Sequence, residues 1–298
     1  MFNRAYQNQR LLLACHMASA PMAKSALRWG ADVNQQSSPI AILAQNVLLS
    51  RSQRAFVRYG RPNVNFYAEM IPLLIDHGAD VDLRHRGSGV TALGYMVQTG
   101  YLEWVIKLVE SGANVNGNPR RSGNTYPQHP LLLACQARGA IPSLGGERNF
   151  NQIILYLLDQ GADVHKLDRS GYTALYHLSG QDRTVGLIRR LVNLGAEVNT
   201  DSSRRTPLHH AAENGNPHNV RELLKRGAEV NSLSGNYPPI FLAAFHSRGR
   251  EAERFETVRI LIEAGADLDI EITGNNPQIR EFSLVRRALA LKEESEDS

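Results

Sequence analysis

A five-residue phrase recurs seven times along this 298-residue chain and constrains its fold more than any other feature. Each copy starts with Gly-Ala, continues with a polar residue and then Val or Leu, and ends with Asn, Asp or His. The copies begin at Gly30, Gly78, Gly112, Gly161, Gly195, Gly227 and Gly265. An apolar stretch precedes each glycine, so the phrase predicts a helix end with the glycine in the left-handed region. The chain is therefore expected to be a series of short helical units, although its length alone would suggest two globular domains.

A second phrase opens each unit, and its fullest copy runs from Thr206 to Ala212 as Thr-Pro-Leu-His-His-Ala-Ala. Thr206 is a suitable helix N-cap, and a proline fits the first helical position because it has no N–H to leave unpaired. Leu208, Ala211 and Ala212 share one helix face. Looser copies begin at Gln9, Ser38, Thr91, His129, Thr173 and Pro238.

With these two phrases, residues 9–269 resemble the ankyrin-repeat family, and three of the glycine spacings lie near its period of about 33 residues. The resemblance implies an all-α solenoid of about seven stacked helix–turn–helix units. It also implies β-hairpin fingers, a concave binding groove and a structural hydrogen-bond network around Thr206 and His209. Fold alone says little about function.

The phrases divide the chain into repeats and caps. We expect an N-terminal capping repeat at 1–34, repeat 2 with an arginine-rich insertion at 35–82, repeat 3 at 83–116, repeat 4 with loop insertions at 117–165, repeat 5 at 166–199, repeat 6 at 200–231, repeat 7 at 232–269, a C-terminal cap helix at 270–291 and an acidic disordered tail at 292–298. Phe2 and Tyr6 are expected to cover the edge of the first repeat. Trp29 is either an exposed anchor or part of this cap, and we favour the cap. Asn276-Pro277 is expected to start the C-terminal helix.

The insertion in repeat 2 places four arginines at helical spacing, with no acidic residue between residues 51 and 68. This basic stripe consists of Arg51, Arg54, Arg58 and Arg61. It is either a contact for an anionic ligand or nucleic acid, or simply the solvated face of a long helix. Pro72 further along predicts that the next helix starts near Tyr67 or kinks.

The fingers, between each five-residue phrase and the next helix, are the favoured partner-binding positions. They contain Arg and Tyr, which are enriched at interface hot spots. The candidates are Arg84, Arg86, Lys166, Asp168, Arg169, Tyr172, Ser203, Arg205, Asn236 and Tyr237. Because the row is mostly basic, it suits a protein or peptide with acidic and aromatic character.

His177 and His210 occupy the same position in adjacent repeats, so their side chains are expected to be near neighbours. With Tyr176 and Tyr95 they form an alternative catalytic or ligand-binding group, acting by acid–base chemistry. The competing interpretation is that both are semi-buried histidines with satisfied ring nitrogens. No metal-ligand spacing and no cofactor motif is recognised in the sequence.

The composition bears on the ligands that the protein can bind and on the compartment in which it is found. The net charge of +4 is too small to indicate nucleic-acid binding, and no apolar run approaches the roughly 20 residues of a membrane span. The start of the chain lacks secretory-signal character, and Cys15 and Cys135 fall in distant repeats. We therefore expect a monomer in the cytoplasm or nucleus, not a secreted protein. Asn34, Asn199 and Asn231 resemble asparagines that asparaginyl hydroxylases modify in other ankyrin repeats.

The leading functional hypothesis is a non-enzymatic protein–protein interaction module, acting as an adaptor, inhibitor or assembly scaffold through the groove and fingers. The first alternative is a small-molecule-binding or catalytic groove near His177 and His210. The second is contact with an anionic ligand or nucleic acid through the Arg51–Arg61 stripe.

Overall fold

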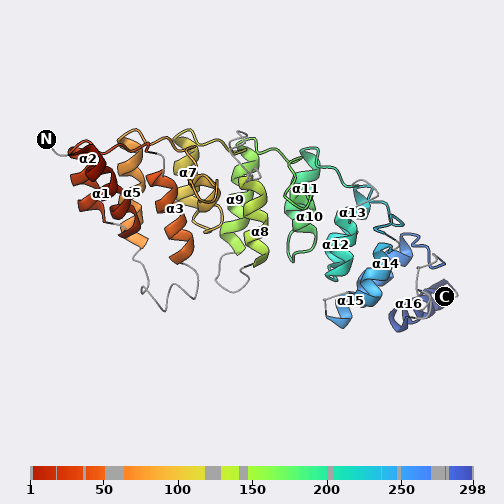
Figure 1. The fold of residues 1–298 in the computed structure, drawn as a ribbon. Helices are drawn as coiled ribbons and strands as arrows, with labels where there is room; N and C mark the ends of the chain where they lie inside the picture. Colours follow the sequence, from red (N-terminus) through yellow and green to blue (C-terminus); the bar gives the residue numbers. More distant parts are fainter. Residues whose placement is uncertain are drawn as a thin grey trace. The chain divides into compact units, whose positions relative to one another are not determined.

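The computed structural model describes residues 3–17, 19–35, 38–50, 64–117, 129–140, 147–199, 205–235, 237–246, 250–269, 279 and 282–296. The chain divides into two compact units, residues 1–163 and 164–298, and each is taken by itself below. Both consist of helices joined by turns, as Figure 1 shows.

The first unit holds four helix pairs. They are α1 (Arg4–Met17) and α2 (Ala20–Arg28), α3 (Pro39–Ser50) and α5 (Val64–Asp76), α6 (Ala92–Met96) and α7 (Leu102–Glu110), and α8 (Pro130–Ala140) and α9 (Glu147–Asp159). The first helices of successive pairs pack on one another, α1 on α3, α3 on α6 and α6 on α8. Among the second helices, α2 packs on α5 and α7 on α9. The unit is therefore a two-layer stack, and we call its layers inner and outer.

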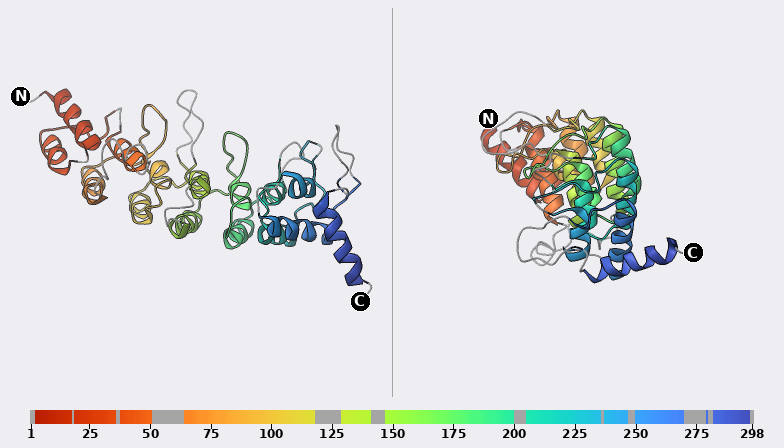
Figure 2. Two further views of the ribbon diagram at one scale, coloured as in Figure 1. Left: turned by 90° about the horizontal axis from the view of Figure 1, so that it is seen from below. Right: turned by 90° about the vertical axis from the view of Figure 1, so that its right-hand side faces the viewer.

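The second unit repeats this arrangement. Its pairs are α10 (Ala174–Ser179) and α11 (Val185–Asn193), α12 (Pro207–Glu213) and α13 (Pro217–Lys225), and α14 (Pro239–Phe241), continued by the π-helical turn η1 (Leu242–His246), with α15 (Glu251–Glu263). The inner helices α10, α12 and α14 pack in series, as do the outer helices α11, α13 and α15. The expected stack of helix pairs is confirmed, and Figure 2 shows the finger turns extending from its side.

The helix ends form as the glycine phrase predicts. All seven phrase glycines have φ between 79° and 92°, which only glycine adopts without strain. The alanine after each one donates its N–H to the carbonyl five residues earlier, as Ala228 does to Leu223 at 3.0 Å. This bond closes the last helical turn and sends the chain back toward the next repeat.

The polar residue that ends the phrase has a role that the sequence did not reveal. The side-chain amide of Asn199 donates to the Gly227 carbonyl at 2.9 Å and accepts from the Glu229 N–H at 3.0 Å. Asn34, Asn116 and Asn231 make the same two bonds to the next repeat. We call this arrangement the asparagine clip, because it joins consecutive turns within each unit.

Four local expectations need correction. The fingers are not β-hairpins, because the described residues contain no strand and only one isolated bridge, between Ser234 and Tyr237. Helix α5 begins at Val64, before the predicted Tyr67, and continues through Pro72. Trp29 is 51% exposed at the end of α2 and so does not fill the cap.

The C-terminal helix extends further than predicted. Helix α16 spans Ser283–Glu296 and includes most of the segment expected to be disordered, whereas the predicted helix start at Asn276-Pro277 lies outside the described residues. Its run of Lys and Glu has high helix propensity, which extends the helix beyond its apolar part. Helix α16 packs on α15 and buries Leu284, Val285 and Ala288, so it closes the end of the second unit as a cap must.

Both cysteines are buried free thiols, as expected from their separate repeats. Burial raises the pKa of Cys15 to about 12. They therefore act as small apolar core residues.

Candidate functional site

The finger at residues 166–172 is built around one carboxylate. The Asp168 side chain accepts the N–H groups of Ser170 at 2.8 Å and Tyr172 at 3.0 Å, while its own N–H donates to the Tyr172 carbonyl. Gly171 completes the turn with a φ of 79°. The finger is thus a tight turn held by its own aspartate.

The same aspartate ties the finger to helix α10. The His177 Nε2–H donates to Asp168 Oδ2 at 2.7 Å, and both side chains are largely buried. Burial raises the pKa of Asp168, but the N–H donors of Tyr172 and Ser170 and the His177 ring outweigh it, so the pKa lies below its usual range. The carboxylate is therefore ionised near neutral pH, and the finger is fixed at its base.

Three rings stack beside this contact. Tyr172 lies on Tyr176 with ring centroids 3.9 Å apart, and Tyr176 lies on His210 at 4.3 Å with the planes 6° apart. His177 meets Tyr172 and Tyr176 edge-on. We call Tyr172, Tyr176, His177 and His210 the ring cluster. It runs from the finger across α10 to α12.

His210 is held on both sides within this cluster. Its Nδ1–H donates to the Tyr176 carbonyl at 2.8 Å, and a Cβ on Gly180 would clash with its ring. Burial lowers the pKa of His210, so the ring is neutral near pH 7. Arg205 and Glu213 form an ion pair beside it. The two histidines do come to one cluster as predicted, but each has its own polar partner.

His209 forms the network that the resemblance implied. Its Nδ1 accepts the Thr206 N–H at 3.1 Å, and its Nε2–H donates to the Tyr237 carbonyl at 3.1 Å, in the next finger. Burial lowers the pKa of His209 to about 4. A buried neutral histidine with both nitrogens engaged is a structural residue that connects α12 to the following repeat.

Tyr95, the fourth residue of the predicted catalytic group, belongs to the first unit, whereas the ring cluster belongs to the second. Its hydroxyl pairs with the Ser88 hydroxyl, which in turn bonds the His85 ring. Burial raises the pKa of Tyr95, so its hydroxyl stays protonated at neutral pH. Tyr95 thus fixes the finger that contains Arg84 and Arg86.

The predicted finger residues differ in how far solvent reaches them. Arg86 and Arg169 are exposed, whereas those of intermediate exposure are Arg84, Lys166, Asp168, Tyr172, Arg205 and Tyr237. Ser203, Asn236 and the stripe of Arg51, Arg54, Arg58 and Arg61 lie outside the described residues. The Tyr237 ring stacks on Phe241 at 4.8 Å, which fixes that finger as well.

Two apolar finger residues were missed in the sequence. Leu167 and Leu233 occupy the same position in two fingers, two residues after the five-residue phrase, and are 51% and 39% exposed. The signal was available, because a leucine follows the phrase where a turn tip would normally be polar. They add an apolar component to a row otherwise dominated by basic side chains.

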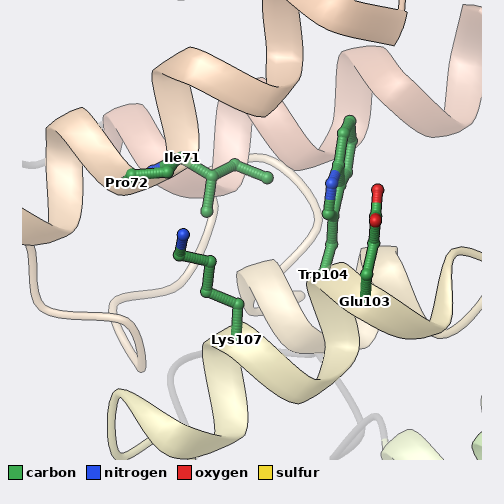
Figure 3. A pocket seen from close by; sticks show the side chains of 5 residues that line it. All are labelled: Ile71, Pro72, Glu103, Trp104 and Lys107. Carbon is green, nitrogen blue, oxygen red and sulfur yellow. The ribbon is translucent and has the colours of Figure 1, made fainter.

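A small cleft lies between the outer helices α5 and α7 of the first unit. Its lining consists of Ile71, Pro72, Glu103, Trp104 and Lys107, and Figure 3 shows the Lys107 side chain extending toward Pro72. None of the predicted site residues lines it. Within the described ranges, no group of three His, Cys, Asp or Glu residues could hold a metal ion, and no helix is long and apolar enough to cross a membrane.

The fold defines a class of protein: stacked helix–turn–helix repeats with exposed side chains on the turns between them. Residues 146–234 match the family model described as ankyrin repeats (3 copies). The matched segment therefore consists of ankyrin repeats, and its stacked helix pairs continue on both sides along the chain.

Among known proteins, the B-cell lymphoma 3 protein homolog of Mus musculus is 30% identical over 171 residues, covering 54% of this chain and 35% of that protein. Ankyrin repeat and SOCS box protein 6 of Homo sapiens is 33% identical over 131 residues, covering 42% of this chain and 28% of that protein. The chain thus matches about a third of the length of these relatives. The crystal structure of the human ASB11 ankyrin repeat domain covers 86% of this chain and 98% of its own, with a TM-score of 0.59 and 18% identity. That likeness concerns the fold.

Proposed function

We propose that this protein is a non-enzymatic interaction module, an adaptor, inhibitor or scaffold, that binds a protein segment through the fingers and inner helices of its second unit. The observation that carries the proposal is the finger at 166–172. Its base is fixed by the Asp168–His177 contact, while Leu167 and Arg169 at its tip are exposed. A rigid turn that presents apolar and cationic side chains loses little conformational entropy on binding.

The chemistry of the fingers indicates the partner. Lys166 and Arg169 are basic, Leu167 and Leu233 are apolar, and Tyr172 offers an aromatic edge. The carboxylate of Asp168 is already occupied by the turn and by His177. A partner segment that combines acidic with apolar or aromatic residues fits this row.

The ring cluster supports a positioning role over a catalytic one. His177 is engaged with Asp168, and the neutral His210 is stacked on Tyr176 and bonded to its carbonyl. A general base needs a proton acceptor directed at substrate. The buried free thiols suit a reducing compartment, the cytoplasm or the nucleus.

The test is affinity capture from extracts of the source organism with three versions of the full chain, read by mass spectrometry. The finger variant is Leu167→Asp with Arg169→Glu. The control variant is Leu194→Asp with Arg190→Glu, which makes the same charge changes at exposed positions at and near the end of α11. We expect a protein that wild type and control capture equally and that the finger variant loses about tenfold or more.

Circular dichroism of the three proteins checks that all are equally folded. If the finger variant captures the protein as well as wild type does, the fingers are not part of the interface. Equal loss in both variants would show a general charge effect instead of a finger contact.

A further inference from the structure

Helix α1 of the first unit has an exposed apolar stripe along one face. Tyr6, Leu13 and Met17 are 55%, 49% and 63% exposed. They are spaced seven and four residues apart, so they form one stripe on the face opposite the buried Leu11, Ala14 and Cys15. Neighbouring exposed apolar side chains of this kind commonly mark an interaction surface.

A comparison with the other repeats of each unit shows what the side chain at the Leu13 position contacts. Leu13 occupies the same phrase position as Ile42, Tyr95, Leu133 and Leu242, which are 1% to 8% exposed. His210, also at this position, packs on Tyr176 of the preceding inner helix. The position therefore faces the preceding inner helix, and on α1 the described residues place no helix against it.

The charge of the first repeat indicates which kind of partner this face would bind. Residues 1–34 contain four basic residues, Arg4, Arg10, Lys24 and Arg28, against the single acidic Asp32, and α1 itself has no acidic residue. Arg4 pairs with Asp32 at 3.4 Å, and Arg10 lies over the Tyr6 ring. A second copy would bring two such cationic faces together, which like-charge repulsion disfavours.

We infer that the α1 face, Tyr6, Leu13 and Met17, is a second docking surface that takes an acidic amphipathic α-helix of another protein in the position of a preceding inner helix. Apolar residues of that helix cover the stripe, and its flanking carboxylates lie near the basic residues of the first repeat.

The probes are two synthetic peptides of 14 residues, the length of α1. Both place leucines on one helix face, and they differ only in carrying glutamates or lysines on the flanks. Each is titrated by fluorescence anisotropy into the wild-type chain, into Leu13→Glu, and into the control Leu155→Glu. Leu155 is also a partly exposed leucine on a helix of the first unit, 38% exposed on α9.

We expect the glutamate peptide to bind wild type and the control alike, and to lose about tenfold or more in affinity for Leu13→Glu. The lysine peptide should bind wild type at least about tenfold more weakly. No binding up to about 1 mM, equal binding of the two peptides, or an unchanged affinity for Leu13→Glu would each overturn the inference. Sedimentation showing self-association that Leu13→Glu abolishes would also overturn it, by assigning the face to a second copy.

Discussion

At the scale of single residues, the asparagine clip shows how one side chain serves two bonding roles. An amide donates and accepts at once, so Asn199 satisfies both a carbonyl and an N–H of the next turn. Asp82 stands at the same place in its repeat and can only accept, from the Asn114 N–H at 2.9 Å. Burial raises the pKa of this carboxylate, although the Asn114 N–H opposes that effect.

Replacing Asp82 with asparagine should therefore stabilise the first unit. The amide can donate to the Gly112 carbonyl, a bond worth about 0.5–1.5 kcal/mol, and it removes a partly buried charge. The measurement is the urea midpoint of unfolding near pH 7. The reverse change, Asn199→Asp, should destabilise the second unit, and a rise in stability there would contradict the clip as described.

Most of the features that the sequence predicts depend on neighbouring residues of the chain, whereas most of those that it misses depend on the next repeat. The seven glycines, and Thr206 with His209, act within one turn, and all behave as predicted. The stack of Tyr172, Tyr176 and His210 and the second role of Asp168 depend on contacts between a finger and two helices. The sequence analysis placed Asp168 among the partner-binding residues and did not predict that its carboxylate also holds the turn.

At the scale of helices, ion pairs between side chains help to stabilise the outer layer of the second unit. Glu222 on α13 accepts bonds from Arg189 of α11 at 3.1 and 3.2 Å and from Arg226, which caps the C-terminal end of α13, at 3.1 Å. A second ion pair, Arg221 with Glu256, joins α13 to α15 at 2.8 Å. These pairs connect three successive outer helices, beyond the apolar contacts of the core.

The Glu222 network should make stability depend on pH in the acid range. Hydrogen bonds from Arg189 lower the pKa of Glu222 below its unfolded value of about 4.3. Its stabilising contribution is therefore complete above that pH and is lost as the pH falls through the folded-state pKa. Urea midpoints measured between about pH 3 and pH 7 should fall less steeply for Glu222→Gln than for wild type.

A matched control is Glu197→Gln, which changes an exposed carboxylate of the same unit. Its pH profile should follow that of wild type. Parallel profiles for all three proteins would show that the Glu222 pairs add nothing to stability.

At the scale of the whole molecule, stability is a sum of local contributions, because each repeat contacts only its neighbours. The cap helix α16 is the clearest place to test this. Val285 is fully buried where α16 packs on α15. The chain should therefore respond to damage at this end in the nearest repeats first.

Val285→Asp places an unpaired charge in that contact and should cost about 3 kcal/mol or more. Hydrogen exchange read by mass spectrometry should quicken in α15 and η1 and remain unchanged in α1 to α9. Faster exchange through both units would show that the chain unfolds as one cooperative body instead.

The asparagine clip also has an evolutionary meaning. At each clipped junction the asparagine side chain donates to the glycine carbonyl of the next repeat. This bond is the same whichever two repeats the junction joins. If a repeat between two such junctions is duplicated or deleted, the new junction can form the same asparagine hydrogen bonds. Asp82, which can only accept, interrupts that series. Copying or loss of repeats is therefore expected to have been freest between the clipped junctions and rarest across the Asp82 junction.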